Sequence, residues 1–275
     1  MALFSLQVVE SDKEKSRGAI CQGLFLRKGT PSPPAVARCR ATLVIEGKIT
    51  TMVGLQVLNR KRLVDTNLIA RFRSLPVANV SDVMARMTAG GSRLRPMHDG
   101  SLLIGPAITV KTRPGDNLFV HKALDMAQPG DVVVVDAGGD LTNSIIGEMM
   151  LAYAATKKLG GIVINGAVRD VGSIRRGSFP VFAAGVTHRG PYKDGPGEIN
   201  VPIAIDGMVV EPGDLMLGDD DGLLCVPIAS AAAIYEKAAA KHAAEEAQIV
   251  AIAEGRYDRA WVDLALQRIG CPVES

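Results

Sequence analysis

PGDVVVVDAGG (residues 129–139) and GGIVINGAVRD (residues 160–170) are the two stretches that decide the fold. Each contains a short apolar, β-branched run bounded by glycine or proline, which is typical of a buried strand. The residues between them, 149–159, have the composition of a helix, and Gly160-Gly161 is suited to end it. Two buried strands joined through a helix predict an α/β fold, in which functional groups usually lie in the loops after the strands.

The rest of the chain continues this pattern less regularly. We expect a cap at Asp65 or Thr66 and a strand over residues 102–111 that Gly105-Pro106 interrupts. Past Gly177, short strands alternate with Pro-Gly and Asp-Gly turns. The expected helices cover residues 64–75, 80–87, 117–127, 169–176 and 228–253, with a last one ending near 268. Because regular β-α alternation is missing, we predict a central short-stranded mixed sheet or barrel flanked by helices.

Composition narrows the classes of function. Of the 275 residues, 47% are hydrophobic and only 4% aromatic, so we expect an aliphatic core and no surface that stacks bases. The net charge of +2 also argues against a nucleic-acid footprint, although a basic arm within residues 1–73 stays open as an alternative. The four cysteines lack metal-finger or CxxC spacing, and no run approaches the roughly 20 apolar residues of a membrane span. We therefore expect a cytoplasmic protein with reduced cysteines and with neither a membrane nor a nucleic acid as partner.

Residues 1–51 differ in composition from the rest of the chain. They contain three prolines in a cluster (Pro31, Pro33 and Pro34), scattered Arg and Lys, and no sustained apolar period. We expect this segment to be a basic, poorly ordered leader, and the main domain with its C-terminal helices to span residues 52–275. Organelle targeting is the alternative for the leader, but its early acidic residues weaken that interpretation.

Two turns after the predicted strands hold the candidates for chemistry. Residues 147–150 (Gly-Glu-Met-Met) open a helix, where unpaired backbone N–H groups and the helix dipole can seat a carboxylate. Arg169-Asp170 directly follows the second strand. A guanidinium suits a carboxylate or an oxyanion, and one or two carboxylates with several waters can bind Mg²⁺. Helix capping is the alternative at both places, but together the two turns predict a site for a small 2-oxo acid.

Other polar segments carry weaker signals. Residues 193–198 (KDGPGE) form an acidic turn that could cover the site or be a plain surface loop. The aspartates at 219–221 lack the alternating ligands of a calcium loop, and a turn before a strand is the better interpretation. The four histidines form no cluster in the sequence, so a histidine metal site is not expected.

From about residue 64 to residue 227 the chain resembles the RraA-like family, which includes 4-hydroxy-4-methyl-2-oxoglutarate aldolases and the regulator of ribonuclease activity. GGDLTNSIIGEMMLAYAATKKLGGIVINGAVRD (138–170) and FPVFAAGVTHRGPYKDGPGEINVPIAIDGMVVEPGDLMLGDDDGLLCVP (179–227) carry the resemblance. It implies a β-β-α swivelling-domain type of fold. It also implies a homotrimer or a dimer of trimers, with sites near the subunit boundaries.

The resemblance also implies roles for individual residues. The family's substrate arginine falls on Arg169 and its metal-ligand aspartate on Asp170. Glu148 stands where some aldolases have an aspartate that positions a water at the metal. Some members take a second acid from a neighbouring subunit's C-terminal helix, which Glu245 or Glu246 could supply. The family's substrate-contacting stretch falls on Gly147, Glu148, Met149 and Met150.

These implications combine into one expected activity. The chain is expected to be a class II pyruvate aldolase that uses Mg²⁺ or Mn²⁺ on Asp170 and cleaves 4-hydroxy-4-methyl-2-oxoglutarate to pyruvate. Arg169 would stabilise the enolate and Glu148 would assist proton transfer. Oxaloacetate decarboxylation needs the same enolate and is expected as well. The alternative is a non-catalytic regulator that binds and inhibits a ribonuclease.

Overall fold

The computed structural model describes residues 44–45, 48–49, 52–88 and 90–273. Contacts divide the chain after Ile49, and the second unit, Thr50–Ser275, contains the large sheet and the helices. In the first unit, β1 (Val44–Ile45) and β2 (Lys48–Ile49) form an antiparallel pair. The expected leader, residues 1–51, lies almost entirely outside the described residues, and its extent stays a prediction.

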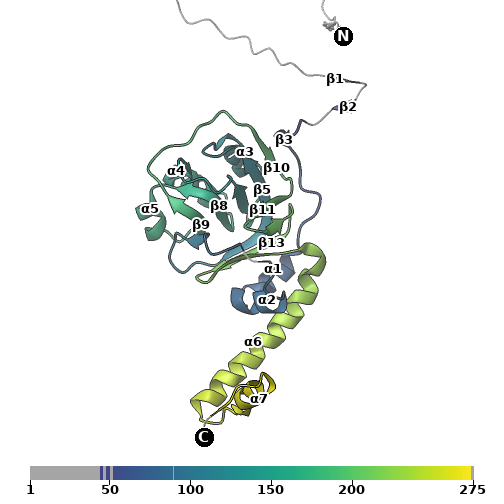
Figure 1. Ribbon diagram of the computed structural model, residues 1–275. Helices are drawn as coiled ribbons and strands as arrows, with labels where there is room; N and C mark the ends of the chain where they lie inside the picture. The colour runs from purple at the N-terminus through teal and green to yellow at the C-terminus, as the bar shows by residue number, and fades with distance from the viewer. Residues whose placement is uncertain (1–43, 46–47, 50–51, 89, 274–275) are drawn as a thin grey trace, which may run out of the picture. The chain divides into compact units, whose positions relative to one another are not determined.

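A mixed sheet forms the centre of the second unit (Figure 1). Its strands are β3 (Leu55–Val57), β4 (Arg95–Pro96), β5 (Leu103–Thr112), β6 (Val132–Asp136), β7 (Ser144–Ile146), β8 (Gly161–Val168), β9 (Val181–Val186), β10 (Gly197–Ile199), β13 (Leu215–Asp219) and β14 (Gly222–Val226). The main order is β14-β13-β5-β6-β8-β9-β4, with β10 beside β5 and β3, and β7 beside β8. The central β5, β6, β8 and β9 are parallel, whereas β13, β10 and β4 join them antiparallel.

Both faces of the central strands are buried, which explains the uninterrupted valine run of β6. Val133 and Val135 pack in one cluster with α3 (Leu118–Met126), α4 (Glu148–Thr156) and α5 (Val171–Arg176). Val132 and Val134 point to the opposite face and pack against the hairpin of β11 (Ile203–Ile205) and β12 (Met208–Val210). Strands covered on both faces are apolar throughout instead of alternating with polar residues.

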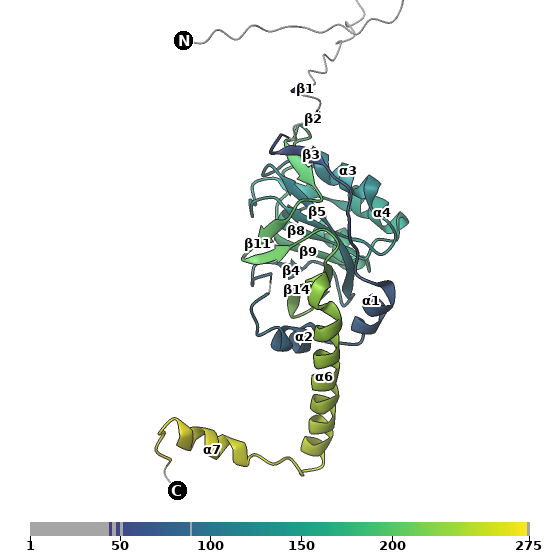
Figure 2. The same ribbon diagram turned by 90° about the vertical axis from the view of Figure 1, so that its right-hand side faces the viewer.

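A second group of helices packs at the β13–β14 side of the sheet. It comprises α1 (Thr66–Phe72), α2 (Val77–Val83) and the first part of α6 (Ala231–Ala253), which follows the short η1 (Ile228–Ser230). Figure 2 shows α2 beside α6, and the Phe72 and Tyr235 rings meet edge to face at 5.3 Å. The last helix is α7 (Ala260–Arg268). Among the described residues, no helix is long and apolar enough to span a membrane.

The predicted α/β fold with a mixed central sheet and flanking helices is confirmed. The second predicted helix, residues 80–87, was misplaced, because α2 begins at Val77, whose N–H donates to Asp219 Oδ2 at 2.9 Å. It ends early because Ala85 and Arg86 have left-handed φ values of 56° and 61°. The expected interruption at Gly105-Pro106 is absent, since β5 runs through it. The short β7 and β10 were not predicted.

A buried ion pair ties the extended segment before α1 to the turn between α3 and β6. Arg60 donates twice to Asp131, at 2.7 and 2.6 Å, with side chains 10% and 3% exposed. Asp131 also accepts from the Gln128 N–H at 2.7 Å. Asp131→Ala leaves a buried guanidinium unpaired, so we expect a loss of about 3–5 kcal/mol in the free energy of unfolding, measured by urea denaturation.

Glu211→Ala is the matched control. It breaks the ion pair with Arg62, whose 2.8 Å contact joins side chains 59% and 49% exposed. Solvent screens such a pair, so the expected loss is below about 1 kcal/mol. Equal losses in the two variants would contradict the structural role given to the buried pair.

Candidate active site

The two turns singled out in the sequence meet at the ends of β7 and β8. The Glu148 N–H, at the start of α4, donates to Asp170 Oδ2 at 2.9 Å, and Arg169 Nε lies 3.7 Å from the same oxygen. β7 pairs with the last residues of β8, which brings the turn after β7 beside the turn after β8. Residues far apart in the chain therefore form one polar group.

Asp170 does not cap its own helix, as the capping alternative supposed. It precedes α5 but makes no side-chain cap there, and its backbone is left-handed, with φ 58° and ψ 33°. That conformation is uncommon for a residue other than glycine, and such residues cluster at functional sites. It directs the carboxylate across to α4, where the side chain is 41% exposed.

Gly147 is required at its position because the two turns approach so closely. A Cβ added there would lie 2.9 Å from Arg169 Cγ and 3.0 Å from Arg169 Nε, and closer still to Asp170 Oδ2. Real Cβ contacts are not that short. Because Gly147 has no side chain, the Asp170 carboxylate has room to reach the start of α4.

Arg169 and Gly147 lie in the wall of a pocket of about 240 Å³. Other hollows in the described structure are as large or larger, but none of them is lined by Arg169 or Gly147. The remaining wall comes from α3, the end of β7, the start of α4 and the loop after β9. Its residues are Asn117, His121, Ile145, Ile146, Met149, Met150, Pro191 and Lys193.

The predicted residues of the α4 turn separate into different environments. Met149 is 86% exposed at the pocket, whereas Met150 is 9% exposed and packs in the core. Glu148 lines a different hollow, between α4 and α5, where its carboxylate accepts from Ser173 Oγ at 3.1 Å. The side chain expected to assist proton transfer therefore lies outside the pocket wall.

The expected carboxylate seat is partly occupied by the protein itself. Asp170 takes the Glu148 N–H, and the Met150 N–H donates to Gly147 O at 3.1 Å. Among the described residues no acceptor meets the Met149 N–H. This amide lies at the positive end of the α4 dipole and is therefore available to an anion such as a carboxylate.

Three polar residues of the wall were not assigned to the site from the sequence. Asn117 is 2% exposed and donates to Ile145 O at 2.9 Å, while its Oδ1 is buried with no partner among the described residues. His121 lies one turn further along α3. Lys193 belongs to the segment for which a covering role was an open alternative. No signal in the sequence joins α3 to the end of β8, so only the sheet topology could reveal this wall.

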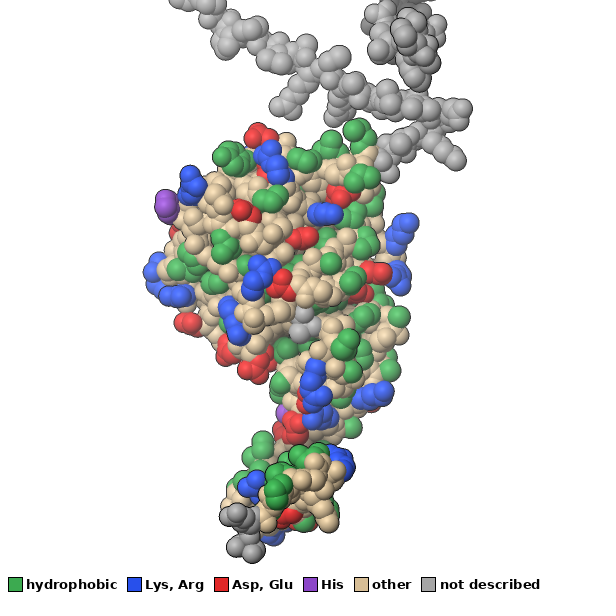
Figure 3. Space-filling model, viewed as in Figure 1, with side chains coloured by type: hydrophobic (Ala, Val, Ile, Leu, Met, Phe, Trp, Pro, Cys, Tyr) green, Lys and Arg blue, Asp and Glu red, His purple; other side chains and the backbone are tan. Residues whose placement is uncertain are grey.

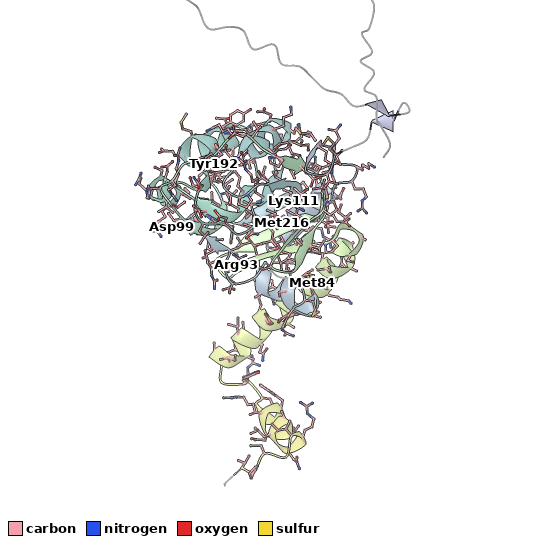
Figure 4. The ribbon with its side chains drawn as sticks, turned by 45° about the horizontal axis from the view of Figure 1, so that its top comes forward. Met84, Arg93, Asp99, Lys111, Tyr192 and Met216 are labelled. Carbon is pink, nitrogen blue, oxygen red and sulfur yellow. The ribbon has the colours of Figure 1, made fainter. Side chains whose placement is uncertain are left out.

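Asp116 anchors the segment that carries Lys193. Its buried carboxylate accepts from the N–H groups of Leu118, Asp194 and Gly195 at 2.9, 2.7 and 2.9 Å. Burial works to raise the pKa of Asp116, but these donors and Arg113 outweigh it and hold the pKa below its ordinary value. The nearby Tyr192 (Figure 4) places its ring centroid 5.8 Å from the Arg113 guanidinium carbon.

The other acidic candidates have structural partners. Asp219, at the end of β13, accepts from the Val77 N–H and so caps the start of α2. This agrees with the interpretation of residues 219–221 as a turn before a strand. Glu245, one of the two acids considered for a neighbouring site, pairs with Lys241 at 2.6 Å and accepts from Asn79. No group of three or more His, Cys, Asp or Glu side chains suited to a metal occurs among the described residues.

Comparison with known proteins establishes the family. Residues 77–225 match the family described as RraA-like: Aldolase/RraA, and the chain belongs to it. The "Putative 4-hydroxy-4-methyl-2-oxoglutarate aldolase" of Halalkalibacterium halodurans is 39% identical over 190 residues, which cover 69% of this chain and 90% of that protein. The 4-hydroxy-4-methyl-2-oxoglutarate aldolase of Thermus thermophilus is 38% identical over 112 residues, covering 41% and 68%.

A solved structure supports the same assignment. The RNA-processing inhibitor RraA from Thermus thermophilus superposes with a TM-score of 0.52 at 31% identity, covering 55% of this chain and 92% of that one. The names in the family thus include both aldolases and an inhibitor of RNA processing. The choice between the two activities has to rest on the site.

The anchor at Asp116 generates a prediction for acid stability. A carboxylate whose pKa is depressed on folding stabilises the fold above its unfolded pKa, about 4, and that contribution is lost as pH falls through the folded pKa. In Asp116→Asn one amide oxygen replaces the two carboxylate oxygens that accept from three N–H groups. We therefore expect the free energy of unfolding to fall by about 2 kcal/mol at pH 7. Urea denaturation between pH 3 and 7 should show a shallower acid slope in the variant; an unchanged slope would contradict this role.

Proposed function

We propose that the chain is a divalent-metal-dependent lyase that cleaves 4-hydroxy-4-methyl-2-oxoglutarate to pyruvate and decarboxylates oxaloacetate. The observation that carries the proposal is the contact of Asp170 with the first turn of α4, beside Arg169, which lines a pocket of about 240 Å³ together with Gly147 from that turn. The membership in the RraA-like family and the aldolase names of its relatives support the reaction class.

The donor set fits Mg²⁺ or Mn²⁺. Asp170 Oδ2 is engaged by Glu148 N–H, but Oδ1 accepts no hydrogen bond from the described residues, and the side chain is 41% exposed. Mg²⁺ typically binds through one or two carboxylates and keeps several waters. Asp170 would hold the metal. When bound, the metal would supply Lewis-acid stabilisation of negative charge on the substrate's oxygens.

The protein's own groups account for the remaining requirements. The Met149 N–H receives the substrate carboxylate at the α4 terminus, and Arg169 lies where the 2-oxo oxygen becomes an enolate oxygen. In aldol cleavage the C3–C4 bond breaks, its electron pair enters the pyruvate enolate, and C4 becomes the ketone of a second pyruvate. The enolate then takes a proton at C3. Loss of CO₂ from oxaloacetate gives the same enolate, so one site serves both reactions.

Assembly as a trimer or a dimer of trimers belongs to the proposal. Met149, which lines the pocket, is 86% exposed, and Leu118 and Tyr192, next in the chain to lining residues, are 42% and 57% exposed. Such side chains are typical of a surface that another subunit covers. On the face in Figure 3, acidic and basic side chains are interspersed, which favours a small-molecule substrate over a nucleic acid.

A cytoplasmic location suits Cys225 and Cys271, which are free thiols.

The rival function is a regulator that binds a ribonuclease, supported by the name of the Thermus RNA-processing inhibitor. A regulator of this kind need not keep the candidate metal ligand, so the presence of Asp170 beside Arg169 favours the enzyme. A lactate-dehydrogenase-coupled assay on both substrates, with and without EDTA, distinguishes the two. Metal-dependent pyruvate release supports the enzyme; no turnover together with tight binding to a ribonuclease supports the regulator.

Asp170→Asn tests the site with little change in shape. The Asn side chain keeps an oxygen for the Glu148 N–H but lacks the charge that a metal needs, so we expect pyruvate release to fall about 100- to 1000-fold or more. Asp220→Asn, on the exposed β13–β14 turn, is the matched control and should keep full activity. Steady-state kinetics over a Mg²⁺ titration is the measurement, and wild-type turnover in Asp170→Asn would refute the site.

A further inference from the structure

The ring of His121 forms no hydrogen bond or ion pair with any residue that the structure describes. All four histidines of the chain lie among the described residues. Both ring nitrogens of His98 contact backbone groups, at 3.0 and 2.7 Å, and His242 pairs with Glu246 at 3.6 Å. His188 is exposed and does not line the pocket. His121 lines it, and no described residue forms a hydrogen bond with its ring.

The position of His121 is fixed by its helix. Asn117 and His121 are four residues apart, so they share one face of α3, and that face forms a wall of the pocket. Asn117 donates to Ile145 O at 2.9 Å and contacts Met150 Sδ at 3.3 Å, which holds the start of α3 against the opposite wall. His121 thereby lines the same pocket as Gly147.

The surroundings of His121 favour its neutral form. His121 is exposed as a residue, but partial burial of its imidazole lowers the pKa, Lys193 lowers it further, and Asp125 on the same helix opposes them only in part. Asp125 is itself engaged by the Tyr153 hydroxyl at 3.1 Å. Arg169, in the same pocket wall, adds another positive charge. A neutral imidazole at pH 7 has a lone pair free to accept a proton.

We propose that His121 is the catalytic base of aldol cleavage: it takes the proton from the C4 hydroxyl of the substrate and returns it to C3 of the enolate. The inference rests on the proposed lyase function. As the hydroxyl proton moves to the imidazole, the electron pair of the O–H bond forms the C4=O double bond, the C3–C4 bond breaks, and its electron pair enters the enolate. The imidazolium then protonates C3, so the base is restored and no further reactant is needed.

Glu148 is the competing candidate, and its geometry is less suitable. Its carboxylate lies in the hollow between α4 and α5 and is held by Ser173 Oγ at 3.1 Å. To reach the pocket it would have to leave that hydrogen bond. His121 already faces the pocket, and its ring has no hydrogen bond to a described residue that would have to break.

The role separates the two reactions that share the site. Aldol cleavage needs the hydroxyl proton removed before the carbon–carbon bond can break. Oxaloacetate loses CO₂ without any such proton, and the resulting enolate can take its proton from water. A loss of His121 should therefore slow the first reaction and largely spare the second, whereas a loss of pocket shape or substrate binding would slow both.

His121→Gln tests this with the full-length, metal-loaded protein. General-base catalysis contributes typically about 100- to 10,000-fold, so we expect kcat for aldol cleavage to fall by that factor. Oxaloacetate decarboxylation should stay close to the wild-type rate. His188→Gln, a change of the same kind at an exposed histidine outside the pocket lining, is the matched control and should affect neither reaction.

The pH profile of aldol cleavage is a second test, because a residue with a purely structural role would not change it. Protonation of His121 would remove the base, so aldol kcat/KM in the wild type should fall at acid pH with a midpoint below the ordinary histidine value of 6.5. That limb should be missing from the wild-type decarboxylation profile and from the His121→Gln profile. In His121→Ala, added imidazole should restore part of the aldol activity but leave decarboxylation unchanged.

Several results would overturn the proposal. Equal losses in both reactions would make His121 a binding or structural residue, and a rise in KM alone would assign it to substrate recognition. Unchanged aldol cleavage in His121→Gln would remove it from the chemistry altogether. These outcomes leave the lyase function intact. A wild-type protein without either activity would instead refute the proposed function, and the role of His121 with it.

Discussion

The hydrogen bond from the Glu148 N–H to Asp170 Oδ2, 2.9 Å long, is the interaction on which the site depends. It joins the turns after β7 and β8, and a side chain at Gly147 would displace its acceptor. The left-handed backbone of Asp170 costs on the order of 1–3 kcal/mol, which a charge-assisted hydrogen bond at a helix N-terminus helps to offset. The backbone thus positions the candidate metal-binding carboxylate before any ligand arrives.

The sheet provides the rigid support that this arrangement needs. β8 is buried along its whole length, and its neighbours β6 and β9 are bound in parallel register. The register of β8 and β9 shifts between Ile164 and Ala167, just before the strand delivers Arg169 and Asp170. Because strands buried on both faces cannot move without opening the core, the turns at their ends hold their geometry.

The sequence revealed the parts of the molecule that depend on local pattern. The valine run of β6, the apolar run of β8 and the glycines around α4 carry their structure in composition, as does the turn that contains Arg169 and Asp170. The sequence predicted that the turns at Gly147 and Arg169 form one site, but it did not predict the contacts that join them. Capping of α5 was the natural local interpretation of Asp170, and only the pairing of β7 with β8 directs its carboxylate to α4. Asn117 and His121 lie on one face of α3, but the periodicity of a helix does not show which other elements pack against that face. The sequence therefore did not place these two residues in the site.

The charges of the pocket reconcile two requirements that otherwise conflict. The proposed dicarboxylate substrate would need cations in the wall, and Arg169 and Lys193 line it. A base near a carboxylate would normally be held protonated, because the negative charge raises its pKa. Lys193 acts in the opposite direction on His121 and lowers the pKa of the imidazole, and partial burial of the ring lowers it more. The cation that would attract the proposed substrate therefore also favours the neutral imidazole, so substrate binding and proton acceptance would be compatible at one pH.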